Sequence, residues 1–298
     1  MESENKIFGM GYNSKIIRIF LITPINFDDS LYDDTVSGMS MALWCNKKYK
    51  PSSYDLSYDT RIEQGDVWFV KRDFLSEFFQ LLPCNCPQIK IVTQHSDYEV
   101  DDDIMKTKPS CVSSIFGSNT TSTHNDAVPI PLGLGPSYCH LTPKSKDIKC
   151  KNTRKDRSRL LYANFRTETY PKERVSVFEK IQTMNDSGVT LVIPSKDGSD
   201  IGVYLEELVS HMFSVCPRGN GIDTHRIWES LYCRTIPIVR YENAHRNFKN
   251  LPILFIDDWS ILSEEYLYRE YERMTHTIWD YSKLSASWWG QQFKMEKQ

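Results

Sequence analysis

Short apolar runs recur along the chain, and the polar stretches between them are long enough for helices. These runs are rich in β-branched residues and predict strands. They cover Ile16–Ile22, Asp66–Val70, Ile89–Thr93, Arg159–Asn164, Val189–Ile193, Met212–Cys216, Thr235–Val239 and Ile253–Ile256. Apolar residues at helical spacing predict helices over Asp73–Leu82, Lys172–Met184 and Tyr204–Met212. Fully apolar strands that alternate with helices are typical of parallel sheets, so the pattern predicts an α/β fold.

One polar segment, Leu141–Arg159, interrupts this pattern near the middle of the chain. It holds eight Lys or Arg residues and two Asp residues. Because no aromatic side chains lie between the charges, we expect a solvated linker rather than a nucleic-acid patch. We therefore predict an N-terminal domain over residues 1–145, a C-terminal domain over 146–272 and a final helix over 273–298 that docks back onto the body. The apolar anchors expected for this helix are Ile278, Leu284, Trp288, Trp289 and Phe293.

Composition and charge narrow the range of partners. The chain has 298 residues and a formal net charge of −3 at pH 7, which gives no general attraction to nucleic acid or anionic lipid. Its start lacks the apolar core of a signal peptide, and no apolar run is long enough for a membrane span. The eight cysteines show no C-x-x-C spacing. We expect a cytoplasmic protein with reduced thiols, no nucleic-acid partner and no membrane span.

The segment CPRGNGIDTHRIWESLYCRTIPIV, Cys216–Val239, places a group of polar residues between two predicted strands. It predicts a glycine-containing turn and then a helix. Gly219 and Gly221 permit positive φ and let the backbone approach a ligand closely. Asp223 or Thr224 is expected to cap the helix. The start of a helix that follows glycines binds anions, because its free N–H groups and its dipole point outward.

Charged residues near this helix start extend the anion site towards a nucleotide site. Arg218 and Arg226 can direct two guanidinium groups at the same phosphate oxygens. Glu229 lies further along the helix, where its carboxylate can accept both hydroxyls of a ribose. The expected donor-binding residues of this segment are Arg218, Gly219, Asn220, Gly221, Thr224, His225, Arg226 and Glu229. Neither a G-x-G-x-x-G nor a G-x-x-x-x-G-K-[ST] motif is present. The alternative is a tight turn with a surface ion pair between Arg226 and Glu229.

The stretch PRGNGIDTHRIWESLYCRTIPIV closely resembles the C-terminal signature of exostosin-like glycosyltransferases. Weaker similarities lie in order along the chain, in VTQHSDYEV (Val92–Val100), FGSNTTSTHNDAVPIPLGL (Phe116–Leu134) and LLYANFRTETYPKERVSVFEK (Leu160–Lys180). Two features depart from the family: the start shows no membrane stem, and Cys233-Arg234 stands where the family often has a small residue and glycine. Members without a stem can be encoded by viruses or bacteria, and the chain is similar to a glycosyltransferase of large algal viruses.

The resemblance implies a GT-B fold, in which two Rossmann-like domains face each other across a cleft. The nucleotide-sugar donor would lie on the C-terminal domain and the glycan acceptor on the N-terminal one. Arginines and a helix N-terminus would stabilise the departing diphosphate, so we expect no metal and no other cofactor. Arg166 could offer one more cation, with a surface arginine as the alternative. The acidic run Glu99–Asp103 could imitate the D-x-D metal motif of another fold, but we expect a solvated acidic loop.

An inverting transfer needs a general base beside the acceptor hydroxyl, near the strand ends of the N-terminal domain. Asp73 is the first candidate because it closely follows the strand DVWFV, although it could instead cap the next helix. His95 and Asp97 are the reserves. The predicted function is an inverting, metal-independent glycosyltransferase with a UDP-sugar donor, for which UDP-xylose is one candidate. The alternative is a nucleotide- or glycan-binding protein of the same fold without turnover.

Overall fold

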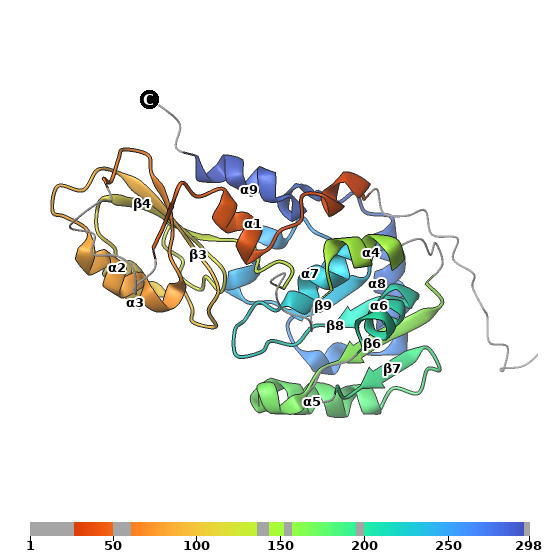
Figure 1. Cartoon of the computed structure of the whole chain (residues 1–298). Coiled ribbons are helices and arrows are strands. Elements are labelled where there is room, and N and C mark those ends of the chain that lie inside the picture. The colour runs from red at the N-terminus through yellow and green to blue at the C-terminus, as the bar shows by residue number, and fades with distance from the viewer. Residues whose placement is uncertain (1–26, 50–60, 136–142, 152–156, 195–199, 295–298) are drawn as a thin grey trace, which may run out of the picture.

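The protein is built on two parallel sheets, each combined with helices (Figure 1). The computed structural model describes residues 27–49, 61–135, 143–151, 157–194 and 200–294. We call residues 27–135 the first half and residues 143–285 the second half. The predicted strand Ile16–Ile22 lies outside the described residues. Neighbouring strands run parallel within both sheets, which confirms the predicted α/β class.

The first sheet has the strand order β1-β2-β3-β4-β5. Its strands are β1 (Lys47–Lys48), β2 (Val67–Phe69), β3 (Ile89–Thr93), β4 (Val112–Gly117) and β5 (Ala127–Pro129). β2 and β3 confirm two predicted strands. β4 was not predicted, because Ser113 and Ser114 interrupt its apolar pattern, and β1 and β5 are too short to show any pattern.

The helical elements of the first half are short. They are α1 (Gly38–Leu43), α2 (Leu75–Leu81) and α3 (Asp102–Lys106), with the 3₁₀ turns η1 (Asp29–Tyr32) and η2 (Arg72–Phe74). Together η2 and α2 confirm the predicted helix after β2. The prediction of an acidic loop is wrong for part of the run Glu99–Asp103. Asp101 accepts a hydrogen bond from the Ile104 backbone and caps α3, because carboxylates stabilise the start of a helix.

The second sheet has the strand order β10-β9-β8-β6-β7. Its strands are β6 (Arg159–Asn164), β7 (Val189–Val192), β8 (His211–Val215), β9 (Ile236–Arg240) and β10 (Leu254–Ile256), which confirm the five predicted strands of this region with small shifts. The chain moves from β6 outward to β7 and then returns to the opposite side of β6 as β8. The strand order therefore reverses between β6 and β8, and ligands of such sheets bind outside the carboxyl ends of the strands at this point.

Helices connect the strands of the second sheet. They are α4 (Ser145–Lys151), α5 (Pro171–Gln182), α6 (Ile201–Ser210), α7 (His225–Tyr232) and α8 (Glu264–Thr275), with the 3₁₀ turns η3 (Thr167–Thr169), η4 (Asn243–Phe248), η5 (Trp259–Ile261) and η6 (Ser282–Leu284). α5 and α6 confirm two predicted helices, whereas α8 was not predicted. Among the described helices, none combines the length and the apolar character that crossing a bilayer requires.

The predicted linker Leu141–Arg159 contains a docked helix in its described part, so the expectation of a solvated linker is wrong there. Ile148 of α4 is fully buried. Lys149 and Lys151 pair with Asp33 and Glu206 of neighbouring elements. One buried apolar side chain and paired charges are enough to hold this helix, and neither feature gives a periodic pattern in the sequence.

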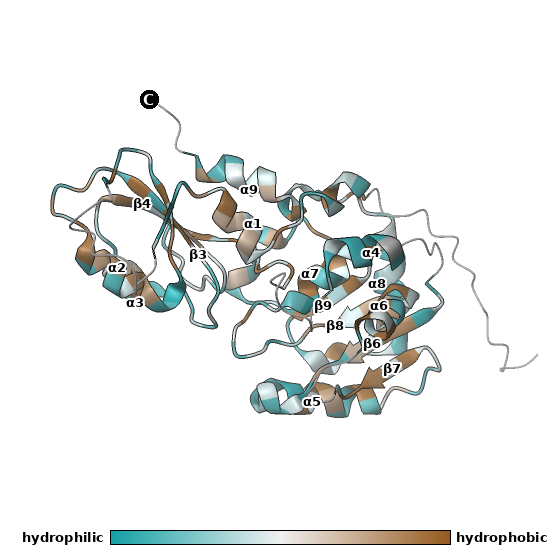
Figure 2. Cartoon of the chain, viewed as in Figure 1, coloured by the Kyte–Doolittle hydropathy of each residue, from teal (hydrophilic) through white to brown (hydrophobic). Residues whose placement is uncertain are grey.

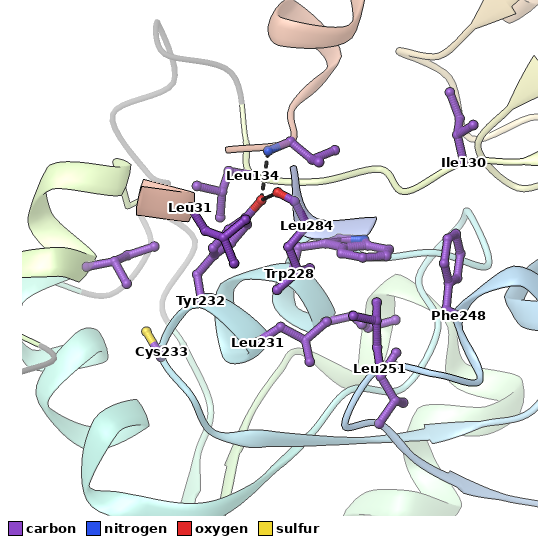
Figure 3. Packing of buried hydrophobic residues seen from close by; sticks show 14 of the residues in the cluster. Leu31, Ile130, Leu134, Trp228, Leu231, Tyr232, Cys233, Phe248, Leu251 and Leu284 are labelled. Atoms are coloured by element: carbon purple, nitrogen blue, oxygen red, sulfur yellow. Dashed lines mark hydrogen bonds between the residues drawn. The ribbon is translucent and has the colours of Figure 1, made fainter. Parts of the chain in front are cut away.

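Each half has its own apolar core, and a third cluster joins the two halves. In Figure 2 the strands β4 and β7 are brown (hydrophobic), whereas α5 alternates between teal and brown. Figure 3 shows the joining cluster around Trp228 and Tyr232 of α7. The Tyr232 hydroxyl accepts a hydrogen bond from the Val36 backbone and donates one to the Leu284 carbonyl. An apolar junction of this kind opposes relative movement of the halves.

The C-terminal helix α9 (Ala286–Phe293) packs back onto the first half, as predicted, but it is much shorter than the predicted helix over 273–298 (Figure 1). Phe293 meets Phe116 of β4 edge to face, with 5.0 Å between the ring centroids. Leu284, Trp289 and Phe293 are buried anchors. Ile278 is 96% exposed, so its predicted role as an anchor is wrong.

The turn after α7 adopts a backbone conformation that usually requires glycine, although no glycine is present there. Arg234, where exostosin-like proteins often have glycine, adopts a left-handed φ of 58°. This conformation costs a side-chain-bearing residue about 1–2 kcal/mol. The Arg234 guanidinium lies 5.0 Å from the ring centroid of Phe27 and pairs with Asp29, and these contacts offset the cost.

Candidate functional site

A pocket of about 720 Å³ lies between the two halves. Its lining residues are Lys71, Asp73, His95, Ser96, Asp97, Tyr98, Asn119 and Leu132 from the first half, and Thr169, Gly219, Asn220, Gly221, Asp223, Thr224 and His225 from the second. The volume is typical of a small-molecule site. Two parallel α/β halves around one pocket, with the last helix packed back, make up the predicted GT-B architecture.

The second half contributes to the pocket at the point where its strand order reverses. Thr169 lies in η3 after β6, and residues 219–225 follow β8. The carboxyl ends of β6 and β8 are adjacent, because these two strands pair directly. The topology therefore brings the predicted glycine segment to the place where an open α/β sheet binds ligands.

The two glycines of this segment differ in what they allow. Neither adopts a positive φ, so that part of the prediction is wrong. A Cβ atom on Gly221 would lie 2.8 Å from Asn119 Nδ2, so Gly221 permits close contact with the first half. A Cβ on Gly219 would come no closer than 3.4 Å to Arg174 Nη2, an ordinary contact. Gly219 lines the pocket with room for a Cβ, but its N–H already donates to the Gly221 carbonyl at 3.0 Å.

The start of α7 lacks a side-chain cap. Thr224 is the N-cap residue, but its hydroxyl makes no capping hydrogen bond, and its buried Oγ1 has no partner among the described residues. His225 Nδ1 donates to the Gly133 carbonyl at 2.7 Å, which fixes the imidazole ring in the pocket wall. Uncapped N–H groups at a helix start remain available for an anion.

Asp223 is buried at the floor of the pocket and joins the two halves. Its Oδ2 accepts from the Leu132 backbone N–H at 2.8 Å, and its Oδ1 accepts from Trp228 Nε1 at 2.8 Å. Burial raises the pKa of Asp223 to about 7, against the hydrogen bonds from Leu132, Trp228 and the Thr224 backbone. Asp223 therefore positions the segment before α7, a role different from the capping role expected for it.

Guanidinium groups converge beside the glycine segment. Arg174 of α5 donates to the backbone carbonyls of Arg218, Arg166 and Pro217 at 2.8, 3.0 and 3.3 Å. Burial, together with the nearby charges of Arg226 and Arg166, lowers the pKa of Arg174 to about 10. Arg226 Nε is buried and has no hydrogen-bond partner among the described residues. Neighbouring cations of this kind favour a bound anion.

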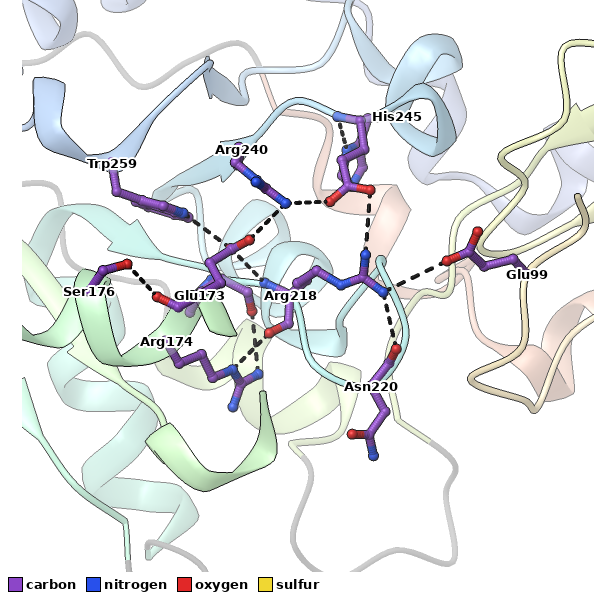
Figure 4. Close-up of polar contacts among 11 residues, drawn as sticks. Glu99, Glu173, Arg174, Ser176, Arg218, Asn220, Arg240, His245 and Trp259 are labelled. Carbon is purple, nitrogen blue, oxygen red and sulfur yellow. Dashed lines mark hydrogen bonds and ion pairs between the residues drawn. The ribbon is translucent and has the colours of Figure 1, made fainter. Parts of the chain in front are cut away.

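Arg218 does not line the pocket. Its guanidinium lies 4.7 Å from the ring centroid of Tyr170 and 3.5 Å from Glu242. It also reaches Glu99 of the first half at 3.8 Å (Figure 4). Arg218 is therefore a link in an ion-pair network between the halves, and a phosphate would have to compete with two carboxylates for it.

Glu229 is buried inside the second half and lies outside the pocket lining. Its Oε2 accepts a hydrogen bond from the Tyr204 hydroxyl of α6 at 2.7 Å. The alternative of a surface ion pair between Arg226 and Glu229 is wrong, because Glu229 is buried and the ion pairs found among the described residues do not join these two side chains. Arg166, which follows β6, has an exposed side chain, as the alternative of a surface arginine predicted.

Asp73 lies on the opposite wall of the pocket. It does not cap η2, whose N-cap residue is Lys71, so the capping alternative is wrong. Its carboxylate lies 3.3 Å from Lys71 Nζ. Burial raises the pKa of Asp73, but hydrogen bonds from Ser96 and Lys71 outweigh this effect and hold the pKa below its ordinary value. Asp73 is therefore ionised at neutral pH and can accept a proton.

His95 and Asp97 follow β3 on the same wall. His95 has a left-handed φ of 62°, which is unusual for a residue with a side chain. Desolvation lowers the pKa of His95, against a hydrogen bond to the Gly38 backbone. The imidazole is therefore neutral at pH 7 and is a second possible base. Asp97 is exposed in the pocket.

Several residues of the site were not predicted from the sequence. Asn119, Asp223 and Arg174 act through hydrogen bonds to distant backbone groups, and a local pattern does not reveal such contacts. Lys71 and Tyr98 are single exposed residues beside predicted ones. Across the described residues, no group of three or more His, Cys, Asp or Glu side chains forms a possible metal-ligand set.

No protein-family model and no curated protein matches the chain. Among solved structures, the chain is similar to an α1,3-fucosyltransferase, with a TM-score of 0.41 and 13% identity over 79% of this chain and 78% of that chain. A second similar structure is an α1,3-fucosyltransferase with GDP-fucose, with a TM-score of 0.38 and 10% identity over 87% of this chain and 97% of that chain. We draw no conclusion about activity from these likenesses, and membership of the exostosin-like family stays a prediction.

Proposed function

We propose that the protein is an inverting glycosyltransferase that moves a sugar from a nucleotide-sugar donor to a glycan acceptor. One observation carries the proposal: the ligand-binding edge of the second sheet faces Asp73, His95 and Asp97 across one pocket. An anion-binding wall opposite a wall with a base is the arrangement that such a transfer needs. Residues 1–145 would hold the acceptor, and residues 146–272 would hold the donor.

The diphosphate of the donor would lie at the start of α7. The uncapped N–H groups and the Arg226 guanidinium would stabilise the charge that grows on the leaving group. Arg166 and Arg218 would be further ligands of the diphosphate. Arg218 would first have to break its ion pair with Glu99 or with Glu242. Glu229 could accept a ribose hydroxyl through Oε1, since its Oε2 is the atom bonded to Tyr204. These groups supply the charge stabilisation, so we propose a transfer without a metal.

The chemical step would use the opposite wall. Asp73, ionised at neutral pH, would take the proton of the acceptor hydroxyl, and the acceptor oxygen would attack the anomeric carbon. The bond from this carbon to the diphosphate oxygen would break, and the nucleoside diphosphate would leave. Neutral His95 or Asp97 would be the base if Asp73 is not. The non-catalytic alternative keeps the donor site and lacks this step.

A panel of nucleotides tests the proposal. We expect one nucleoside diphosphate and its sugar to raise the melting temperature of the full chain, because ligand at about 100 times its Kd adds about 2.7 kcal/mol of stability. The panel should contain UDP-xylose, other UDP-sugars and GDP-sugars, since one similar structure contains GDP-fucose. Release of free diphosphate from the stabilising sugar would support an enzyme. Stabilisation without release, with every acceptor tried, would favour the binding protein, and no stabilisation would contradict both.

A further inference from the structure

Asn119 occupies an unusual position at the floor of the pocket. It follows β4, is 3% exposed and has a left-handed φ of 54°. Asn tolerates this conformation better than most residues with a side chain, but it persists only where the surroundings hold it. The contacts of its side chain show what holds it.

The Asn119 amide joins the two walls of the pocket. Its Nδ2 donates to the Ser96 carbonyl of the first half at 3.2 Å, and its Oδ1 accepts from the Asp223 backbone N–H of the second half at 2.8 Å. Its own carbonyl accepts from the Val100 backbone at 3.1 Å. Asn119 therefore holds the loop 94–100 near both ends and ties this loop to the segment before α7.

The same loop reaches the first candidate base. Ser96 and Asp73 line the same pocket and Ser96 lowers the pKa of Asp73, while the Ser96 carbonyl accepts a hydrogen bond from Asn119 Nδ2. His95 and Asp97 are the neighbours of Ser96 in the chain. All three candidate bases thus adjoin Ser96, either in the chain or in the pocket, and the Asn119 side chain holds the Ser96 carbonyl.

The segment before α7, which we assign to the donor, also packs closely against Asn119. A Cβ on Gly221 would lie 2.8 Å from Asn119 Nδ2, so the glycine segment has no room for a side chain where it passes this amide. Asp223, whose N–H binds Asn119, also accepts from the Leu132 backbone at 2.8 Å. The spacing between the walls is therefore set by contacts at the pocket floor.

The halves are also joined away from the pocket. Asn243 of η4 donates to the Thr121 carbonyl at 2.7 Å, and Asn247 donates to the Pro129 carbonyl at 3.0 Å. Together with the apolar cluster in Figure 3, these bonds keep the halves together without Asn119. Loss of the Asn119 amide would therefore release the two pocket loops and leave the assembly of the halves intact.

From these contacts we infer that Asn119 is a positioning residue, which sets the distance between the base-bearing loop 94–100 and the phosphate-binding segment 217–224. The inference rests on the proposed function, since it assigns these loops to the two reactants. A displacement of about 1 Å in a reacting group can cost about 10²-fold in rate. The effect of losing Asn119 should therefore be larger in turnover than in donor binding.

Asn119→Gly removes the amide and suits the left-handed backbone, so the variant should fold. Asn243→Ala is the matched control, because it also removes one asparagine bond between the halves. In the full chain, hydrogen exchange should become faster in loop 94–100 and segment 217–224 of Asn119→Gly, and it should be unchanged there in Asn243→Ala. Unchanged exchange in Asn119→Gly would overturn the inference.

Donor hydrolysis, with water as the acceptor, gives the second readout. The nucleotide sugar is the one that stabilises the wild type most. We expect Asn119→Gly to lower kcat about 10- to 100-fold while KM changes less than about threefold, and Asn243→Ala to match the wild type. Equal losses in both variants, or a loss confined to KM, would overturn the positioning role. Faster loop exchange in Asn119→Gly with no hydrolysis by the wild type would support the contact and contradict the proposed function.

Discussion

The two walls of the pocket are built differently. On the second half, Asp223 lines the pocket and is buried, and both its carboxylate oxygens accept hydrogen bonds from within the protein. On the first half, Asp73, His95 and Asp97 are exposed to the pocket. Contacts within the protein therefore fix the carboxylate of the second wall, whereas the candidate bases of the first wall face the pocket.

This difference follows from the chemistry proposed for each wall. A preformed wall loses little conformational entropy on binding and holds its dipoles where charge will develop. A base needs a proton-accepting group within reach of the substrate, and its environment has only to keep that group in the right protonation state. Four predictions, ordered from the largest expected effect to the smallest, can break or sharpen this comparison.

Asp73→Asn tests the exposed wall. Turnover should fall by roughly 10²–10⁴-fold, the usual contribution of a positioned base. The affinity for the nucleoside diphosphate should stay unchanged, because Asp73 lies opposite the donor wall. Steady-state kinetics and calorimetric titration measure the two quantities.

The substitution is close to isosteric, and Asp73 does not cap η2, so the variant should keep its fold. Asp97→Asn and His95→Gln are the matched variants in the same pocket. If a folded Asp73→Asn protein turned over normally, the base would have to be whichever of these two residues is sensitive.

Arg226→Ala tests the preformed wall. Turnover should fall about 10²–10³-fold, as on loss of one preorganised electrostatic group, and it should fall more than donor affinity. Arg159→Ala, which removes a surface ion pair with Glu207, is the control. Equal losses in turnover and affinity would mean that Arg226 binds the ground state and transition state alike.

The pH dependence of unfolding tests whether the Asp223 carboxyl is buried in the second wall. Its carboxyl keeps its proton up to about pH 7 in the folded protein, whereas its ordinary pKa is 3.8. The stability that this group contributes is therefore fully present at low pH and is lost as the pH rises through about 7. Between pH 5 and 8 the wild type should lose about 2–3 kcal/mol relative to Asp223→Asn, which cannot titrate. A constant difference in unfolding free energy across this range would contradict the burial of the carboxyl.

Alanine substitutions of Gly221 and Gly219 separate two roles of the segment: contact with the other wall and contact with a ligand. Gly221→Ala should destabilise the protein by about 1–3 kcal/mol, because the new Cβ would collide with the Asn119 amide. Gly219→Ala should leave the unfolding free energy nearly unchanged and weaken the binding of the nucleoside diphosphate. Denaturant unfolding and titration of both variants measure these effects, and a reversed pattern would exchange the two assignments.

The second half could be predicted from the sequence because its signals are local. The strand, glycine segment and helix of Cys216–Val239 follow one another in the chain, and apolar runs mark the five strands. The first half gave weaker signals. Serines interrupt β4, and α3 is one short helix started by the carboxylate of Asp101.

The site could be predicted only in part, for the same reason. The candidate bases and the glycine segment lie next to predicted strands, so their positions followed from the topology. The sequence does not show that Gly221 faces Asn119, or that Arg218 pairs with Glu99, because these residues are distant in the chain. The prediction of positive φ at Gly219 and Gly221 was wrong because a chain can also need glycine where two segments pack closely, as Gly221 does against Asn119.

A structure of the full chain with the nucleoside diphosphate that stabilises it most would test the central claim directly. We predict phosphate oxygens at the N–H groups that begin α7, within reach of Arg226 and next to Gly219, and the ribose on the side of Glu229. The first wall, with Asp73 and loop 94–100, should stay free for an acceptor. A nucleotide bound on the first wall, or away from the carboxyl ends of β6 and β8, would contradict the account.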